Sequence, residues 1–179
     1  MHARMAEDER AFVKRRNASD QPPDSGQEPT VPRLRDDEAR LKGDSYLRKV
    51  EIRPPYADAD SFQHLNNVAL ARYFEEGRAA MNMELFGVDA VVRSSAGVQL
   101  DLASIAIEYV AQGQCPGSVT VATGVTSLGR SSFTQSAAIF QDDICLELCD
   151  AVTVCAVSGK GHPCPEHVRT ALSPMCFAR

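Results

Sequence analysis

The sequence has no surplus of positive charge, no long apolar run and no apolar leader. Its 179 residues carry 19 Lys and Arg against 24 Asp and Glu, which gives a formal net charge of -5 at pH 7. Proteins that hold a nucleic-acid backbone need a basic surface, so the charge disfavours that class. No stretch reaches the roughly 20 apolar residues of a membrane-spanning helix. The opening residues, MHARMAEDERAFVKRR, lack the apolar core of a signal peptide. We therefore expect a cytoplasmic protein that binds neither nucleic acid nor a membrane.

The cysteines lack the spacing of a metal or redox site. No two of them are separated by two residues, and the four-residue step from Cys145 to Cys149 has no second ligand pair. In a chain without an export signal, buried thiols stay reduced. We expect no metal and no disulfide among the six, which are Cys115, Cys145, Cys149, Cys155, Cys164 and Cys176.

The length allows one ordinary domain, and the composition places its start near residue 45. Residues 1–44 are rich in Pro, Ser, Asp, Glu, Arg and Gln, without sustained apolar periodicity. Such a segment buries too little apolar surface to offset the entropy of ordering it. We expect residues 1–44 to be a disordered extension and residues 45–179 to be the folded domain.

Within residues 45–179, one strand and one long helix are followed only by strands and a short helical tail. The segment YLRKVEIRPPY alternates as a strand does. From Asn67 to Phe86, apolar residues recur at helical spacing, and Gly87 follows as a stop signal. Four further alternating stretches are joined by short turns, one of them at Asp142-Asp143. This order predicts an α+β fold in which the helix lies across one face of an antiparallel sheet.

The turn before the helix, YADADSFQHLNN, is crowded with polar side chains. One Asn suffices to cap a helix, so capping leaves most of them unexplained. The free N–H groups at a helix start can polarise a carbonyl, and a nearby ionised Asp can act as base or nucleophile. A His can orient the carboxylate, the water or the carbonyl. Acyl transfer is one interpretation of this turn, and a purely structural Asp and His is the other.

The stretch YADADSFQHLNNVALARYFEEGR resembles the signature of hotdog-fold acyl thioesterases of the 4-hydroxybenzoyl-CoA thioesterase type. The order of elements is similar from about Tyr46 to Leu172. The resemblance implies a curved antiparallel sheet wrapped around one central helix, and hydrolysis of an acyl-CoA or acyl-carrier-protein thioester. It implies a catalytic carboxylate at Asp60, an oxyanion site at the backbone N–H near Asn67, and no cofactor. His64 matches a catalytic histidine of the similar plant acyl-carrier-protein thioesterases.

The sequence departs from these patterns at two places in the turn. Phe62 stands where the plant enzymes carry an asparagine, and Gln63 replaces the commoner glycine. Glu108 lies near a carboxylate of the plant enzymes, but an exposed strand charge explains it as well. The resemblance also suggests a set of substrate-binding residues, which are Tyr56, Asn66, Glu76, Arg130, Ser131 and Ser132.

Two other functions fit a hotdog fold. One is a non-catalytic acyl-binding protein. The other is a hydratase or dehydratase, which needs an acid/base pair that brackets a C=C bond. Here Asp60 and His64 lie four residues apart on one loop, which disfavours that function. The resemblance further implies a homodimer or homotetramer whose substrate channel lies between subunits.

Overall fold

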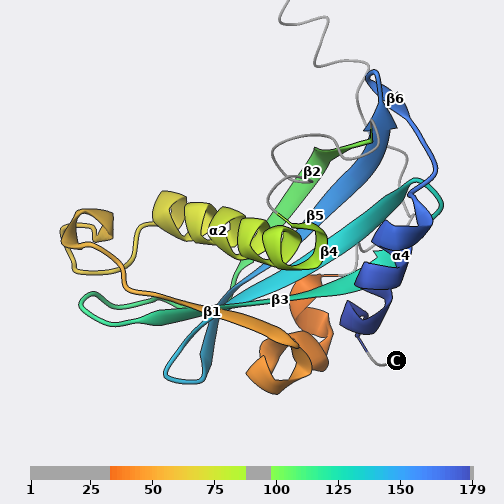
Figure 1. The fold of residues 1–179 in the computed structure, drawn as a ribbon. Coiled ribbons are helices and arrows are strands. Elements are labelled where there is room, and N and C mark those ends of the chain that lie inside the picture. Colours follow the sequence, from red (N-terminus) through yellow and green to blue (C-terminus); the bar gives the residue numbers. More distant parts are fainter. Residues whose placement is uncertain (1–32, 88–97, 178–179) are drawn as a thin grey trace, which may run out of the picture. The chain divides into compact units, whose positions relative to one another are not determined.

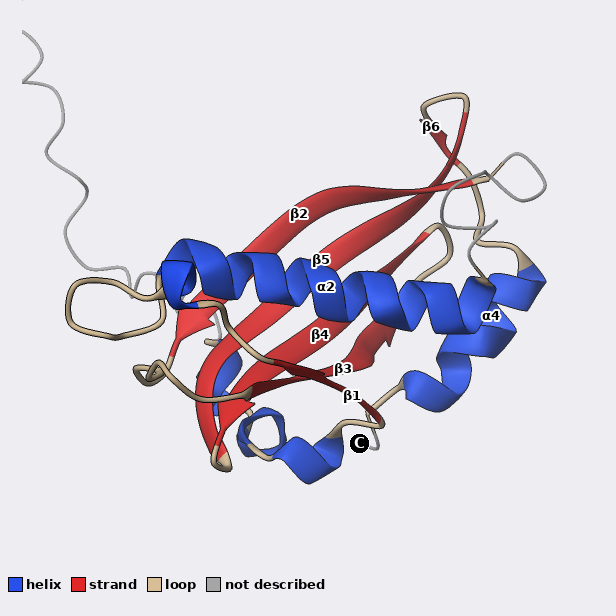
Figure 2. Ribbon diagram, turned by 60° about the vertical axis from the view of Figure 1, so that its left-hand side comes forward, coloured by secondary structure: helices blue, strands red, loops and turns tan. Residues whose placement is uncertain are grey.

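An antiparallel sheet curls around one long helix in the computed structural model, which describes residues 33–87 and 98–177 (Figures 1 and 2). The sheet order is β1-β3-β4-β5-β2, with the short β6 paired to the end of β5. Helix α2 (Asn67–Phe86) lies across the concave face. The predicted α+β arrangement is confirmed. The strands are β1 (Arg48–Ile52), β2 (Gln99–Tyr109), β3 (Val119–Leu128), β4 (Ser132–Gln141), β5 (Ile144–Val157) and β6 (Lys160–Gly161).

Helix α2 begins and ends where the sequence predicted. The side chain of Asn66 accepts a hydrogen bond from the Val68 amide at 2.8 Å, which caps the first turn. Gly87 follows with a φ of 79°, a conformation that glycine adopts without steric cost. These two residues therefore fix both ends of the helix.

The apolar face of α2 packs on the sheet, with one exception to the predicted stripe. Leu70, Tyr73, Phe74 and Met81 are buried, whereas Val68 is 70% exposed. An α-helix turns about 100° per residue, which places Val68 roughly 160° away from Leu70 around the axis. The apolar spacing of the sequence from Val68 onward had predicted that Val68 belongs to the buried stripe, and this prediction is wrong.

Gly77 brings the middle of α2 against strand β3. A Cβ atom at this position would lie 2.5 Å from Cγ1 of Val121. Glycine costs up to about 1 kcal/mol in a helix interior relative to alanine. The close approach of helix and sheet explains why glycine stands at this position.

Part of the expected N-terminal extension belongs to the domain. Residues 34–45 form three 3-10 turns: Leu34–Asp36, Glu38–Leu41 and Gly43–Ser45. The guanidinium group of Arg40 in the second turn is buried, where it donates to Ser136 at 2.7 Å and pairs with Asp150. This correction moves the expected boundary at residue 44 to the N-terminal side of residue 33. Residues 1–32 lie outside the described residues.

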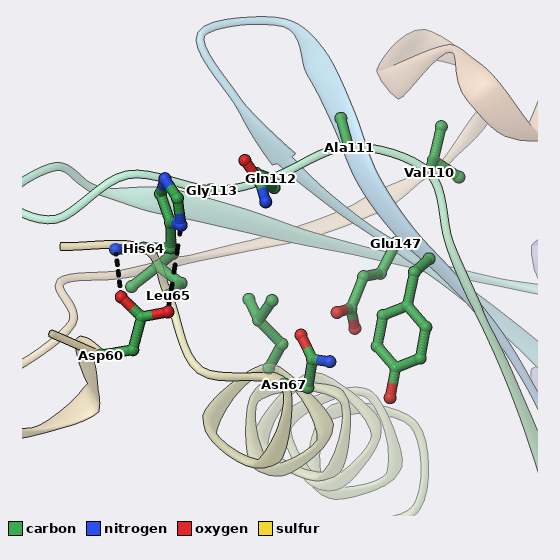
Figure 3. Close-up of a pocket in the computed structure, with 11 residues that line it drawn as sticks. Asp60, His64, Leu65, Asn67, Val110, Ala111, Gln112, Gly113 and Glu147 are labelled. Atoms are coloured by element: carbon green, nitrogen blue, oxygen red, sulfur yellow. Dashed lines mark hydrogen bonds and ion pairs between the residues drawn. The ribbon is translucent and has the colours of Figure 1, made fainter. Parts of the chain in front are cut away.

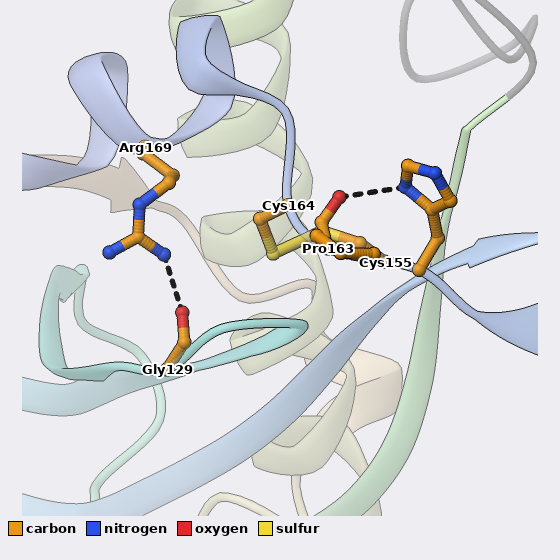
Figure 4. Close-up of a disulfide and its surroundings, with 6 residues drawn as sticks. Gly129, Cys155, Pro163, Cys164 and Arg169 are labelled. Carbon is orange, nitrogen blue, oxygen red and sulfur yellow. Dashed lines mark hydrogen bonds between the residues drawn. A yellow bond between two sulfur atoms is a disulfide. The ribbon is translucent and has the colours of Figure 1, made fainter.

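Two of the six cysteines form a disulfide, against the expectation of six reduced thiols. The chain turns back through β6, and this brings Cys164 alongside Cys155, with their Cα atoms 5.4 Å apart (Figure 4). That separation is ordinary for a disulfide. The sequence separation of nine residues gave no sign of this pairing. The disulfide joins the end of β5 to the segment that leads into helix α4 (Glu166–Leu172).

We predict that Arg40→Ala lowers the free energy of unfolding by about 3 kcal/mol, because it leaves the Asp150 carboxylate poorly paired. For a domain of this size the loss corresponds to a fall in Tm of roughly 10 °C. Arg53→Ala is the matched control, since Arg53 is exposed. Thermal unfolding of the two variants checks the prediction. Equal effects of the two substitutions would contradict it.

Candidate functional site

A pocket of about 490 Å³ opens beside the N-terminal end of α2 (Figure 3). The loop before the helix contributes Asp60, His64 and Leu65, and the helix contributes Asn67 and Leu70. The segment that follows β2 and one position of β5 complete the wall. The structure thus brings together the three residues predicted as catalytic, which are Asp60, His64 and Asn67.

The carboxylate of Asp60 is fixed by the backbone of its own turn. Its Oδ1 accepts hydrogen bonds from the amides of Phe62 at 2.8 Å and His64 at 3.0 Å. Its Oδ2 lies 3.9 Å from Nδ1 of His64. The side chain is 39% exposed, so the carboxylate is both oriented and accessible from the pocket.

The same turn explains why glycine is the commoner residue before the histidine. Gln63 has a φ of 63°, in the left-handed region that glycine enters freely. For a residue with a side chain, this backbone conformation costs roughly 1–2 kcal/mol of free energy. The backbone hydrogen bond from Cys115 N to Gln63 O, at 2.9 Å, helps to hold this conformation.

The first aspartate of the turn has a structural role. Asp58 is buried, and its carboxylate accepts a hydrogen bond from the Tyr73 hydroxyl at 2.6 Å and pairs with Arg72. The Tyr73 hydrogen bond is the main cause that holds the pKa of Asp58 below its ordinary value, with Arg72 adding to it against the effect of burial. Asp58 therefore ties the loop to α2, while Asp60 remains accessible.

The two asparagines at the start of α2, Asn66 and Asn67, have different roles. The Asn66 side chain caps the helix, so its oxygen is already used. The Asn67 carboxamide points into the pocket (Figure 3). Capping satisfies one of the unpaired amides of the first turn, and the remaining amides carry the positive end of the helix dipole. This end of α2 can therefore stabilise negative charge on an oxygen atom.

The other predicted substrate-binding residues do not line this pocket. Tyr56 is 77% exposed, and Glu76 lies on the exposed side of α2. Arg130, Ser131 and Ser132 lie at the β3–β4 turn, where Ser132 pairs with Val154. Strand β5 reaches the pocket at Glu147, so within one chain the turn is roughly 20 Å away along the sheet.

Glu108 faces away from the pocket into a contact with the N-terminal turns. Its carboxylate pairs with Arg35 and accepts from the Arg35 amide at 3.3 Å. Burial raises the pKa of Glu108, but the Arg35 hydrogen bonds and charge outweigh burial and leave it below the ordinary value. The alternative of a plain exposed strand charge is also incomplete, because Glu108 anchors the segment from Leu34 to Asp36.

One acidic residue of the pocket, Glu147 on β5, was not among the predicted site residues. Its side chain is 1% exposed, and burial raises its pKa to about 7. A β-bulge between β4 and β5 inserts Leu146 opposite the step from Ile139 to Phe140. Glu147 lies on the face that carries α2, as does Cys149 two residues later, in keeping with regular alternation. The bulge instead places Leu146 on this same face beside Glu147. The only signal in the sequence was one acid inside the apolar run ICLELC.

Neither a membrane-spanning helix nor a metal-binding cluster is found among the described residues. No helix there is long and apolar enough to cross a membrane. No three His, Cys, Asp or Glu side chains in the part of the chain that the structure describes lie close enough to hold a metal ion.

Comparison with known proteins identifies the family. Residues 54–172 match the thioesterase-like superfamily, and the chain belongs to that superfamily. A predicted thioesterase from Bacillus stearothermophilus has a similar structure, with 25% identity, a TM-score of 0.65, and coverage of 73% of this chain and 97% of that one. A thioesterase superfamily protein from Jannaschia is 20% identical, with a TM-score of 0.68 and coverage of 76% and 97%.

A third similar structure is a thioesterase from Thermus thermophilus that is complexed with coenzyme A and Zn. It is 19% identical, with a TM-score of 0.63 and coverage of 73% of this chain and 95% of that one. No curated protein matches the sequence. The family and the structures together confirm the predicted hotdog fold.

Because Glu147 is buried, we expect the free energy of unfolding to depend on pH. Its pKa is about 7 in the folded chain against an ordinary value of 4.5, so between these values the folded state binds more protons than the unfolded state. Stability then falls as the pH rises, by up to about 3 kcal/mol. We predict that Glu147→Gln raises Tm by several degrees at pH 8 and leaves it unchanged near pH 4. A difference in Tm that does not vary with pH would contradict this explanation.

Proposed function

We propose that the protein hydrolyses an acyl-CoA thioester, with Asp60 as its catalytic carboxylate. The main support is the position of Asp60: two backbone amides orient one of its carboxylate oxygens, and the residue lines the pocket beside the first turn of α2. Membership of the thioesterase-like superfamily supports thioester hydrolysis in general. The coenzyme A bound by the Thermus thermophilus thioesterase supports the choice of CoA as the carrier.

In the proposed reaction, the substrate's thioester carbonyl lies at the N-terminal end of α2. Asp60 takes a proton from a water molecule as the water oxygen bonds to the carbonyl carbon. The negative charge that develops on the carbonyl oxygen is stabilised by the first-turn amides near Asn67. The C–S bond then breaks, the acid is released, and the CoA thiolate takes up the proton. His64 positions the Asp60 carboxylate or the attacking water.

An alternative route within the same proposal uses the carboxylate as the nucleophile. Asp60 then forms a mixed anhydride with the acyl group, and water hydrolyses it. After a single turnover in ¹⁸O-labelled water, label found in Asp60 identifies the anhydride route. Attack by water labels the released acid only, whereas hydrolysis of the anhydride at the aspartyl carbon labels Asp60.

The first test is Asp60→Asn. Asparagine keeps the oxygen that accepts the two amide hydrogen bonds but removes the basic carboxylate, so kcat for thiol release from acyl-CoA is expected to fall about a hundredfold or more. Free thiol is measured with a colorimetric reagent. Turnover within a few-fold of the wild type would refute the role of Asp60.

Two matched variants control for effects on folding. Asp142→Asn changes an exposed aspartate of the β4–β5 turn and should leave both kcat and Tm unchanged. Asp58→Asn removes the partner of Tyr73 and Arg72, so it should lower Tm. Asp60→Asn should resemble Asp142→Asn in stability and differ from it only in activity.

We also propose that the protein forms at least a dimer through strand β2. This strand is an edge of the described sheet, and its exposed side chains include Leu102, Ile105 and Tyr109. An uncovered apolar edge strand invites pairing with a second chain. Tyr109 also lines the pocket, so pairing at this edge would complete the pocket wall.

The prediction is a mass of at least twice 19.4 kDa by light scattering. Ile105→Lys, which places a charge on the proposed contact, should shift the protein toward the monomer mass and reduce thioesterase activity. Lys49→Glu on the opposite edge strand is the control and should do neither. A wild-type protein that is fully active at the monomer mass would contradict the proposal.

A further inference from the structure

Glu147 is a buried acid without a partner. Among the described residues, its Oε2 is the only buried carboxylate oxygen that lacks a hydrogen bond. The other strongly buried carboxylate, Asp58, is held by Tyr73 and Arg72. An unsatisfied buried polar group costs about 1–3 kcal/mol, and a charged one costs more. The hydrogen bonds among the described side chains do not account for Glu147.

The side chain points toward space that a ligand can occupy. In Figure 3 the carboxylate of Glu147 and the carboxamide of Asn67 project into the same pocket, from β5 and α2. Glu147 shares this face of the sheet with Cys149, and the β-bulge at Leu146 lies directly on its N-terminal side. Bulges are frequent next to functional sites. Leu65 and Leu70 line the same pocket, so the wall around Glu147 contains apolar as well as polar side chains.

The chemistry of the pocket restricts what can satisfy Glu147. An alkyl chain would displace water and leave the carboxylate without a partner. An acyl group that ends in a carboxylate would meet both Asp60 and Glu147, two groups that carry negative charge when ionised. A hydroxyl or ammonium group donates a hydrogen bond and removes the cost of burial. The other titratable groups of the pocket are His64 and Tyr109.

We propose that Glu147 determines substrate specificity by accepting a hydrogen bond from an O–H or N–H group on the acyl part of the substrate. This inference rests on the proposed function, since it concerns the same pocket. The protein then prefers polar, donor-bearing acyl groups over plain alkyl chains of the same length. A site that binds a donor rejects the analogue that lacks it, because its own polar group is left unpaired.

The test measures binding to CoA thioethers, which cannot be hydrolysed. A series of 2-oxoalkyl-CoA thioethers of increasing chain length ends in a methyl, a hydroxyl, an ammonium or a carboxylate group. At the best length, calorimetry of the full-length wild type should give a Kd about tenfold lower for the hydroxyl or the ammonium compound than for the methyl compound. The carboxylate compound should bind most weakly. Equal or tighter binding of the methyl compound at every length would overturn the inference, as would no detectable binding of any compound.

Two substitutions connect the preference to Glu147. Glu147→Met removes the acceptor at similar volume, so the methyl compound should then bind at least as tightly as the hydroxyl compound. Glu147→Gln keeps a neutral acceptor, so it should retain the hydroxyl preference and lose the ammonium preference. A wild-type preference that survives in Glu147→Met would overturn the inference. Circular dichroism confirms that both variants are folded.

This design separates the inference from the proposed function. Binding of thioethers requires no turnover, so the preference can be measured even in Asp60→Asn or in a protein that cleaves no thioester. A donor preference without thiol release would refute hydrolysis and leave the role of Glu147 standing. Thiol release without a donor preference would support hydrolysis and refute the role of Glu147.

Discussion

The packing of helix α2 into the curved sheet is the constraint on which the site depends. Gly77 lets the helix approach Val121 so closely that a larger residue would force the Val121 side chain or the helix to shift. This contact fixes the height of the helix above the sheet, and the Asn66 cap fixes where it begins. The positive end of the helix is thereby placed beside the loop that carries Asp60. A helix shifted by one turn, about 5.4 Å, would separate the amides from the carboxylate.

The turn before α2 uses its two aspartates for opposite purposes. Asp58 is buried and bonded to Tyr73 and Arg72, and these bonds attach the loop to the helix. Asp60 is held through one oxygen only, by amides of its own turn. A carboxylate with all its positions filled is a poor base, whereas one that is oriented and still accessible is available for chemistry. The rigidity that Asp58 supplies is what lets Asp60 stay accessible without becoming disordered.

The sequence predicted the local features of this protein better than the long-range ones. Asn66 and Gly87 set the helix ends through short-range capping, and the spacing of Asp60, His64 and Asn67 places all three within one turn and its helix. Arg40 and Asp150 are 110 residues apart, and no local pattern announces their pairing. The disulfide depends on the reversal at β6, and the pocket position of Glu147 depends on β5 passing beside the start of α2. Alternation along a strand predicts which face a residue occupies, but not which distant segment of the chain lies beside it.

The pocket therefore holds two carboxylates in different surroundings. Asp60 is partly exposed at the loop, and Glu147 is buried in the sheet with a pKa raised to about 7 by the loss of solvent. Burial alone raises the pKa of Glu147, and protonation relieves the cost of holding a charge away from solvent. A hydrogen-bond donor from a ligand relieves the same cost without protonation. The two groups thus differ in what they require: in the proposed reaction Asp60 is the accessible base beside the helix terminus, whereas Glu147 is buried and requires a proton or a donor.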